Sequence, residues 1–160
     1  MKRFLLDTGI LLGLIGKAPW ALWARSEFGL TDGGTVTFTS VICRGELLAL
    51  AEKRGWGKKK RKILQEVLNE FPTLDINQED ILKAYALIDA WTHGKRLDFP
   101  EHAFPPPKPA RPMTKNDIWI AATASVTNAV LLSTDKDFTH LHDKWVTFIY
   151  VDPTMFLPEN

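Results

Sequence analysis

The chain has 160 residues, 45% of them hydrophobic, which suits one globular domain over residues 1–160. With 20 Lys and Arg against 19 Asp and Glu, the formal net charge is +1, so any nucleic-acid surface has to be local. A single cysteine, Cys43, excludes an intramolecular disulfide framework and a cysteine-based zinc site.

The N-terminal segment superficially resembles a secretory signal, because Lys2–Arg3 precedes the apolar stretch Phe4–Gly16. Asp7 interrupts that stretch, at a cost of about 2.5–3.5 kcal/mol for an acid at the centre of an inserted segment. The uninterrupted run Ile10–Ile15 is also shorter than a usual signal core. No other stretch approaches the length of a membrane helix. We therefore expect a cytoplasmic protein that does not contact a membrane.

The first half of the chain alternates short apolar runs with amphipathic segments. Arg3–Leu6 is too short for a helix and suits a buried strand, and Ser40 can cap a helix. The expected elements are a strand at Arg3–Leu6, a strand at Val36–Phe38, a helix with its body at Glu46–Lys53, an amphipathic helix at Lys58–Phe71, a small strand at Leu74–Ile76 and a helix capped by Asn77 that runs through Trp91.

The second half begins with the segment Asp98–Pro112, which holds six of the ten prolines and is predicted to be an extended loop. After it we expect a helix at Lys115–Asn128 capped by Thr114, a strand at Ala129–Leu132, a short helix at Lys136–His142 and a strand at Val146–Val151. Short apolar strands that alternate with helices indicate an α/β fold whose sheet is mostly parallel and covered on both faces.

Four acidic residues occupy related places on this predicted map. Asp7 and Asp135 follow strands, Asp117 lies in the first turn of a helix, and Glu46 lies about one turn into another. In open parallel sheets, ligands bind beyond the carboxyl ends of the strands. Carboxylates gathered there would repel one another, and a divalent cation would relieve the repulsion. Oxygen ligands without Cys or His favour Mg²⁺ or Mn²⁺.

Each of these acids also has a purely local explanation. Asp7 could be a turn residue, Asp135 a helix cap, Asp117 an acid favoured by the helix dipole, and Glu46 a solvated helix residue. Singly these explanations are the simpler ones. Taken together, acids at the same ends of several strands favour a shared site.

Four blocks of sequence resemble PIN-domain ribonucleases, and most closely the VapC-like toxins of toxin–antitoxin pairs. The blocks are Leu5–Thr8, Ser40 with Glu46–Leu48, Lys115–Ala124, and Leu132–Phe138. They span nearly the whole chain in the order of the family. The resemblance implies a three-layer α/β/α sandwich, RNA hydrolysis that depends on Mg²⁺ or Mn²⁺, a homodimer, and inhibition by a cognate antitoxin.

The resemblance also implies roles for individual residues. Asp7, Glu46, Asp117 and Asp135, which we call the acidic quartet, would bind the metal and carry catalysis. Thr8 and Ser133 would supply hydroxyl groups beside the quartet. Asp137 is a further candidate, which we interpret as an acid that supports the site or stabilises its helix, with direct binding of the metal as the alternative. Two features depart from the family: Gly9 stands where asparagine is common, and the Asp98–Pro112 loop is unusually long.

The expected reaction is hydrolysis of a phosphodiester by activated water. A bound cation would polarise the phosphate, a carboxylate would take the proton from water, and the products would carry a 5′-phosphate and a 3′-hydroxyl. Three alternatives stay open: a catalytically silent PIN scaffold, a structure-specific DNA nuclease of the flap-endonuclease type, and a receiver-like or flavodoxin-like domain.

Basic residues gather at Lys53–Arg54 and Lys58–Lys62. A solvated helix face is the simple explanation. However, cations at a helix start oppose the helix dipole, which favours a role in binding phosphate or an acidic partner. The RNA-binding candidates are Lys58, Lys59, Lys60, Arg61, Arg111 and Lys115, with Trp56 as a possible stacking neighbour.

The Asp98–Pro112 loop leads directly into the helix that carries Asp117. It is either a passive spacer or an exposed segment that helps to select substrate or inhibitor. Phe99, His102 and Phe104 would then offer stacking faces.

Overall fold

The fold was analysed in a computed structural model of the chain, which describes residues 1–98 and 104–157. Five parallel strands form one sheet in the order β3-β2-β1-β4-β5. In chain order the elements are β1 (Lys2–Leu6), α1 (Thr8–Ile15), α2 (Pro19–Glu27), β2 (Thr35–Ser40), α3 (Val41–Lys53), α4 (Lys58–Glu70), β3 (Thr73–Leu74), α5 (Glu79–Thr92), α6 (Lys115–Thr127), β4 (Val130–Ser133), the 3₁₀ helix η2 (Lys136–Leu141) and β5 (Thr147–Tyr150).

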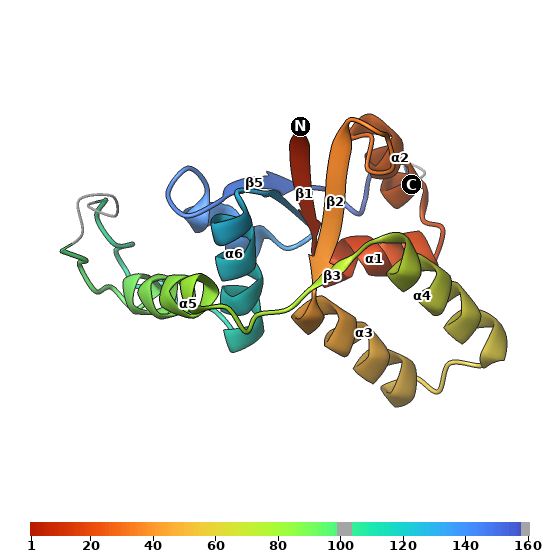
Figure 1. Cartoon of the computed structure of the whole chain (residues 1–160), viewed down its shortest axis with the longest axis horizontal. Helices are drawn as coiled ribbons and strands as arrows, with labels where there is room; N and C mark the ends of the chain where they lie inside the picture. The colour runs from red at the N-terminus through yellow and green to blue at the C-terminus, as the bar shows by residue number, and fades with distance from the viewer. Residues whose placement is uncertain (99–103, 158–160) are drawn as a thin grey trace.

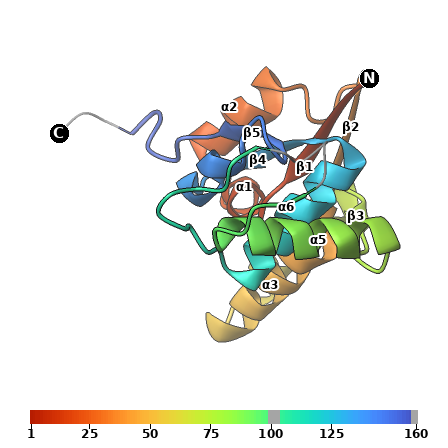
Figure 2. The ribbon, with the colours of Figure 1, turned by 90° about the vertical axis from the view of Figure 1, so that its left-hand side faces the viewer.

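Helices cover both faces of the sheet, as expected for a three-layer sandwich. Figures 1 and 2 show α5 and α6 on one face and α1 and α2 on the other. In the same views, α3 extends from the end of the sheet where β1 and β2 finish. The predicted α/β/α architecture is confirmed, with every strand pair parallel.

The apolar N-terminal stretch forms the centre of this fold. Leu5 and Leu6 of β1 are fully buried between β2 and β4. Asp7 then ends the strand and caps α1, because its carboxylate accepts a hydrogen bond from the backbone N–H of Thr8. Sequence analysis placed no helix at α1 or α2. The short segment Thr8–Ile15 is apolar on nearly all sides, so it lacks the amphipathic period by which a surface helix is recognised.

The predicted Ser40 cap of α3 is confirmed, because the Ser40 hydroxyl accepts from the backbone N–H of Ile42. Other predicted boundaries were wrong by a few residues. The predicted Asn77 cap is wrong: Gln78 precedes α5 and makes no side-chain cap. Strand β3 is Thr73–Leu74 instead of Leu74–Ile76. The helix predicted at Lys136–His142 is the 3₁₀ helix η2.

The described part of the proline-rich loop, residues 104–112, is largely exposed but is fastened to α5. The backbone carbonyl of Phe104 accepts a hydrogen bond from the indole of Trp91, and their rings meet edge to face. At the other end, the Arg111 backbone N–H donates to the Thr92 carbonyl over 2.8 Å. Phe104 is thus partly used in packing, whereas Phe99 and His102 lie outside the described residues. Within residues 1–98 and 104–157, no helix combines the length and apolarity needed to cross a membrane.

Gly9 is matched to its neighbour Thr134. A Cβ atom built on Gly9 would lie 2.2 Å from the Thr134 hydroxyl oxygen. Gly9→Ala is therefore expected to lower the free energy of unfolding by about 1–3 kcal/mol, as overpacking usually does. Urea denaturation measures this effect. Adding Thr134→Ala should restore most of the loss.

The matched control for this prediction is Gly45→Ala in α3, where a Cβ would meet nothing within 4 Å. This change is expected to leave stability unchanged or to raise it by up to about 1 kcal/mol. Equal stabilities of Gly9→Ala and the parent protein would show that Thr134 moves aside without cost.

Candidate functional site

The acidic quartet lies at the carboxyl ends of the strands, each residue positioned by a different element. Asp7 follows β1 and caps α1, and Asp135 follows β4 and caps η2. Glu46 lies in α3, which leads on from β2, and Asp117 lies in the first turn of α6. Because β1, β2 and β4 are parallel neighbours, their ends bring these segments to one edge of the sheet.

Two carboxylates of the quartet have raised pKa values. Burial raises the pKa of Asp7 from 3.8 to about 6, and the charges of Asp117 and Glu46 add to the rise. The pKa of Asp117 is also raised, first by burial and then by Asp135, Glu46 and Asp137. The site therefore favours any ligand that neutralises negative charge.

Three hydroxyl groups each hold one carboxylate of the quartet. Ser133 donates to Asp7 Oδ2, and Thr8 donates to Glu46 Oε1 over 2.9 Å. Thr114 donates to Asp117 Oδ2 over 2.6 Å. Ser133 Oγ also accepts from the Asp135 backbone N–H. Ser133 therefore joins Asp7, which follows β1, to Asp135, which follows β4.

Sequence analysis identified Thr114 only as a helix cap and missed its bond to the Asp117 carboxylate. The signal was available, because a Thr three residues before an acid is the spacing of a capping box. Asp137 lies in the first turn of η2, where its backbone N–H donates to Asp135 Oδ1. Asp137 therefore lies beside Asp135, and its supporting role stays a prediction.

The donor atoms at this site are all hard oxygens. Cys43 is the nearby sulfur, with Sγ 3.9 Å from Asp7 Oδ1, but burial and the Asp7 charge raise the pKa of its thiol to about 12. Cys43 therefore stays protonated and is a poor metal ligand. The chemistry of the donor set fits Mg²⁺ or Mn²⁺. Among the described residues, no three Asp, Glu, His or Cys side chains are already arranged around a common metal position.

Two hollows adjoin the quartet. The first, which we call the α3 groove, has a volume of about 550 Å³ and runs from Glu46 along α3 to Lys53. Its lining residues are Thr8, Val41, Ile42, Gly45, Glu46, Ala49, Leu50, Lys53 and Asn116. The second, the Arg111 pocket, measures about 360 Å³ and is lined by Arg111, Pro112, Met113, Thr114, Lys136, Asp137 and His140.

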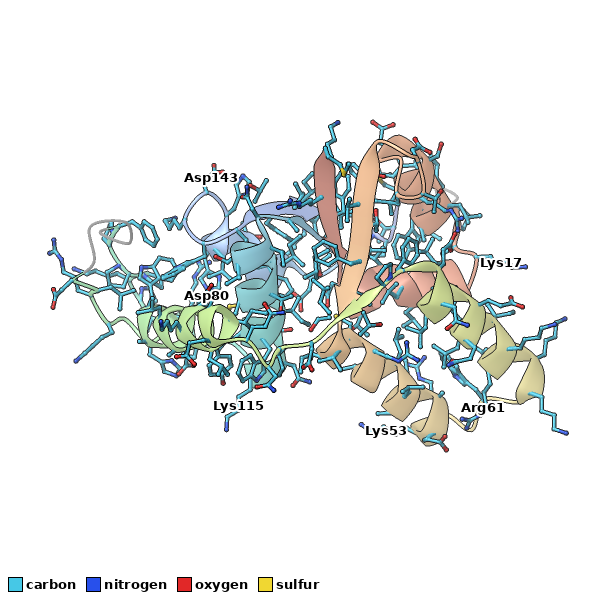
Figure 3. The ribbon with its side chains drawn as sticks, in the orientation of Figure 1. Lys17, Lys53, Arg61, Asp80, Lys115 and Asp143 are labelled. Carbon is cyan, nitrogen blue, oxygen red and sulfur yellow. The ribbon has the colours of Figure 1, made fainter. Side chains whose placement is uncertain are left out.

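The basic candidates fall into different surroundings. Lys58 and Lys59 are exposed at the start of α4. Arg61 is engaged with α3, because its guanidinium bonds to Glu52 and to the backbone carbonyls of Trp56 and Ala51. Figure 3 shows Arg61 of α4 beside α3, and Lys115 pointing outward at the start of α6. The expected RNA-binding set is therefore scattered over the surface and does not form one patch.

Trp56 does not offer a stacking face of the predicted kind. Its side chain is only 7% exposed, and Lys60 Nζ lies 4.1 Å from the ring centre. The ring is therefore occupied by packing and by a cation–π contact.

The chain was also compared with known proteins. It is similar to VapBC2 from Rickettsia felis bound to a promoter DNA fragment, with 17% identity and a TM-score of 0.72, over 94% of this chain and 99% of that chain. It is similar to DNA-bound VapBC from Salmonella typhimurium, with 17% identity and a TM-score of 0.71, over 94% and 98%. VapBC-1 from nontypeable Haemophilus influenzae gives 24% identity and a TM-score of 0.67, over 92% and 97%. No curated protein matched the chain.

At these identities the solved structures establish the fold. The family itself follows from a sequence match, because the family model of the PIN domain covers residues 4–144. This match sets aside the receiver-like and flavodoxin-like alternatives. The chain belongs to the PIN-domain family.

Proposed function

We propose that this chain is a metal-dependent endoribonuclease and the toxin of a toxin–antitoxin pair. The observation that supports this most strongly is the position of Asp7, Glu46, Asp117 and Asp135 at the carboxyl ends of the strands of a PIN-domain sheet, where hydroxyl groups hold three of the four carboxylates. A buried acid such as Asp7, 7% exposed and with a raised pKa, typically marks a functional site.

In this proposal the acidic quartet would hold Mg²⁺ or Mn²⁺ through its carboxylate oxygens. When bound, the cation polarises a phosphate and makes water more acidic. Thr8, Ser133 and Thr114 orient the carboxylates by the hydrogen bonds described above. A carboxylate oxygen not used by the cation takes the proton of the attacking water. The products are a 5′-phosphate and a 3′-hydroxyl.

The proposal of an antitoxin partner rests on the descriptions of structurally similar proteins. VapBC-5 from Mycobacterium tuberculosis is described as a member of the VapBC family of toxin–antitoxin systems, and this chain covers 100% of that chain at a TM-score of 0.61. We predict that this chain also binds a cognate antitoxin, forms a homodimer and lies in the cytoplasm.

The proposed activity is tested by incubating the purified chain with single-stranded RNA, single-stranded DNA and flap DNA in Mg²⁺ or Mn²⁺. We expect cleavage of RNA, 5′-phosphorylated products and complete inhibition by EDTA. Cleavage of flap DNA in place of RNA would support the structure-specific DNA nuclease. Binding of RNA without any cleavage in either metal would support the silent scaffold.

The basic start of α4 yields a separate prediction. Converting Lys58, Lys59 and Lys60 to Gln is expected to weaken RNA binding and to reduce the slope of affinity against salt by about 0.7 per lost phosphate contact. Fluorescence anisotropy over a range of salt concentrations measures the slope. Lys2→Gln is the control, because Lys2 is exposed at the start of β1, at the opposite end of the strand from Asp7. An unchanged slope would indicate a solvated face or a surface for an acidic protein.

A further inference from the structure

The Arg111 pocket contains two cationic side chains that have no carboxylate partner among the residues the structure describes. The Arg111 backbone is fixed by its bond to Thr92, but its guanidinium makes no hydrogen bond or ion pair within residues 1–98 and 104–157. Lys136 Nζ lies 4.9 Å from the centre of the Tyr150 ring and has no carboxylate within ion-pair distance in the same ranges. Arg111 and Lys136 therefore line one hollow together with the Asp137 carboxylate, and neither cation is paired with that carboxylate.

The walls of the pocket are held by packing. The His140 ring lies parallel to the Trp91 ring, with an interplanar angle of 3° and centroids 6.1 Å apart. Trp91 also contacts Phe104, so the stack is joined to the start of the described loop. Pro112 and Met113 add apolar surface between Arg111 and Thr114. A ligand would thus meet a preformed surface with charge on one side and apolar groups on another.

The Arg111 pocket and the α3 groove are both lined by residues next to the acidic quartet. Thr114 lines the pocket while its hydroxyl holds Asp117. Asn116, two residues later, lines the α3 groove together with Glu46. The start of α6 therefore contributes to both hollows, through Thr114 at its cap and Asn116 directly before Asp117. A strand that enters both hollows would pass Asp117.

We propose that the Arg111 pocket binds a backbone phosphate of the RNA strand, next to the phosphate that is cleaved. This inference rests on the proposed function. The guanidinium of Arg111 can form two parallel bonds to phosphate oxygens, and Lys136 adds a second positive charge. Asp137, which also lines the pocket, lies beside the quartet, because its backbone N–H donates to Asp135 Oδ1 over 2.8 Å. The phosphate would accordingly bind on the Arg111 side.

In this proposal the proline-rich loop helps to position the substrate, because it carries Arg111. The loop ends at Pro112, and its hydrogen bond to α5 sets the place of Arg111 beside η2. Phosphate binding there would fix the position of the substrate strand relative to the quartet, which is the positioning that phosphate contacts commonly provide.

The test is an NMR titration of the metal-free chain with the trinucleotide pApApA. We expect the amide signals of Met113, Thr114, Asp137 and His140 to shift. Arg111→Gln should weaken binding at least fivefold, Lys136→Gln should weaken it less, and the Lys2→Gln control should leave it unchanged. Shifts that avoid this pocket, or equal affinity of Arg111→Gln and the parent, would overturn the proposal.

Two further measurements separate the possible causes. Replacing one phosphate at a time by a neutral methylphosphonate should weaken binding to the parent chain most at a single position. At that position the replacement should not weaken binding to Arg111→Gln any further. An acidic peptide that competes as strongly as pApApA would assign the pocket to a protein partner and contradict the proposal. If the chain binds pApApA here but cuts no RNA in Mg²⁺ or Mn²⁺, the proposed nuclease activity fails and the phosphate site stands.

Discussion

Asp117→Asn and Asp7→Asn are each expected to reduce RNA cleavage by about a thousandfold or more. Removing one charge from the quartet weakens its hold on a cation whose contribution to rate is several kcal/mol, and each 1.36 kcal/mol is worth a factor of ten. Asparagine nearly preserves the shape of aspartate. In the Asp7→Asn variant, the amide oxygen can still accept from the Thr8 backbone N–H, as the Asp7 carboxylate does.

Single-turnover cleavage of labelled RNA at saturating protein measures this effect. The matched control is Asp80→Asn, an exposed acid in the first turn of α5. It should retain near-normal activity. A folded Asp7→Asn or Asp117→Asn protein with more than a tenth of the parent rate would remove that residue from the proposed ligand set.

Below about pH 6, the metal-free chain is expected to become more stable as the pH falls. Asp7 has a pKa of about 6 in the folded chain, raised first by burial, against 3.8 for an ordinary aspartate. The folded state therefore holds a proton that the unfolded state releases between these values, and stability is lost as the pH rises through this window. At about 1.4 kcal/mol per pKa unit, the contribution of Asp7 amounts to about 3 kcal/mol.

Urea denaturation in EDTA at pH values from 4 to 7 measures this dependence. Asp7→Asn should flatten it and raise the free energy of unfolding at pH 7 by up to about 3 kcal/mol. Mg²⁺ should then stabilise the parent more than the variant, because only the parent retains the full quartet. An Asp7→Asn protein that is less stable than its parent at pH 7 would show that the carboxylate is well accommodated without metal.

The elements predicted from the sequence were those with a clear period or a clear stop signal. The apolar runs around Leu5 and Leu131 lie in strands, and Thr114 caps its helix as expected. Helix α1 escaped prediction, since a short helix buried on most sides carries no amphipathic pattern. Strand β3 shifted by a residue because two residues of edge strand contain little pattern to read.

The acids of the candidate site could be selected from sequence, because parallel strands place their carboxyl ends together. Their individual partners could not. The bond from Thr8 to Glu46 joins residues 38 positions apart, and that from Ser133 to Asp7 joins residues 126 apart. Likewise, composition marks Arg61 as one cation in a basic run, whereas only the packing of α4 on α3 commits its guanidinium to Glu52 and to backbone carbonyls.

Titration with Mn²⁺, followed by electron paramagnetic resonance of the free ion, tests the central claim that the acidic quartet holds a divalent cation. The parent chain is expected to remove Mn²⁺ from solution and to release it on addition of excess Mg²⁺. The double variant Asp7→Asn/Asp117→Asn should leave the free Mn²⁺ signal unchanged, while Asp80→Asn should bind as the parent does. Equal Mn²⁺ binding by the folded double variant and the parent would contradict the account.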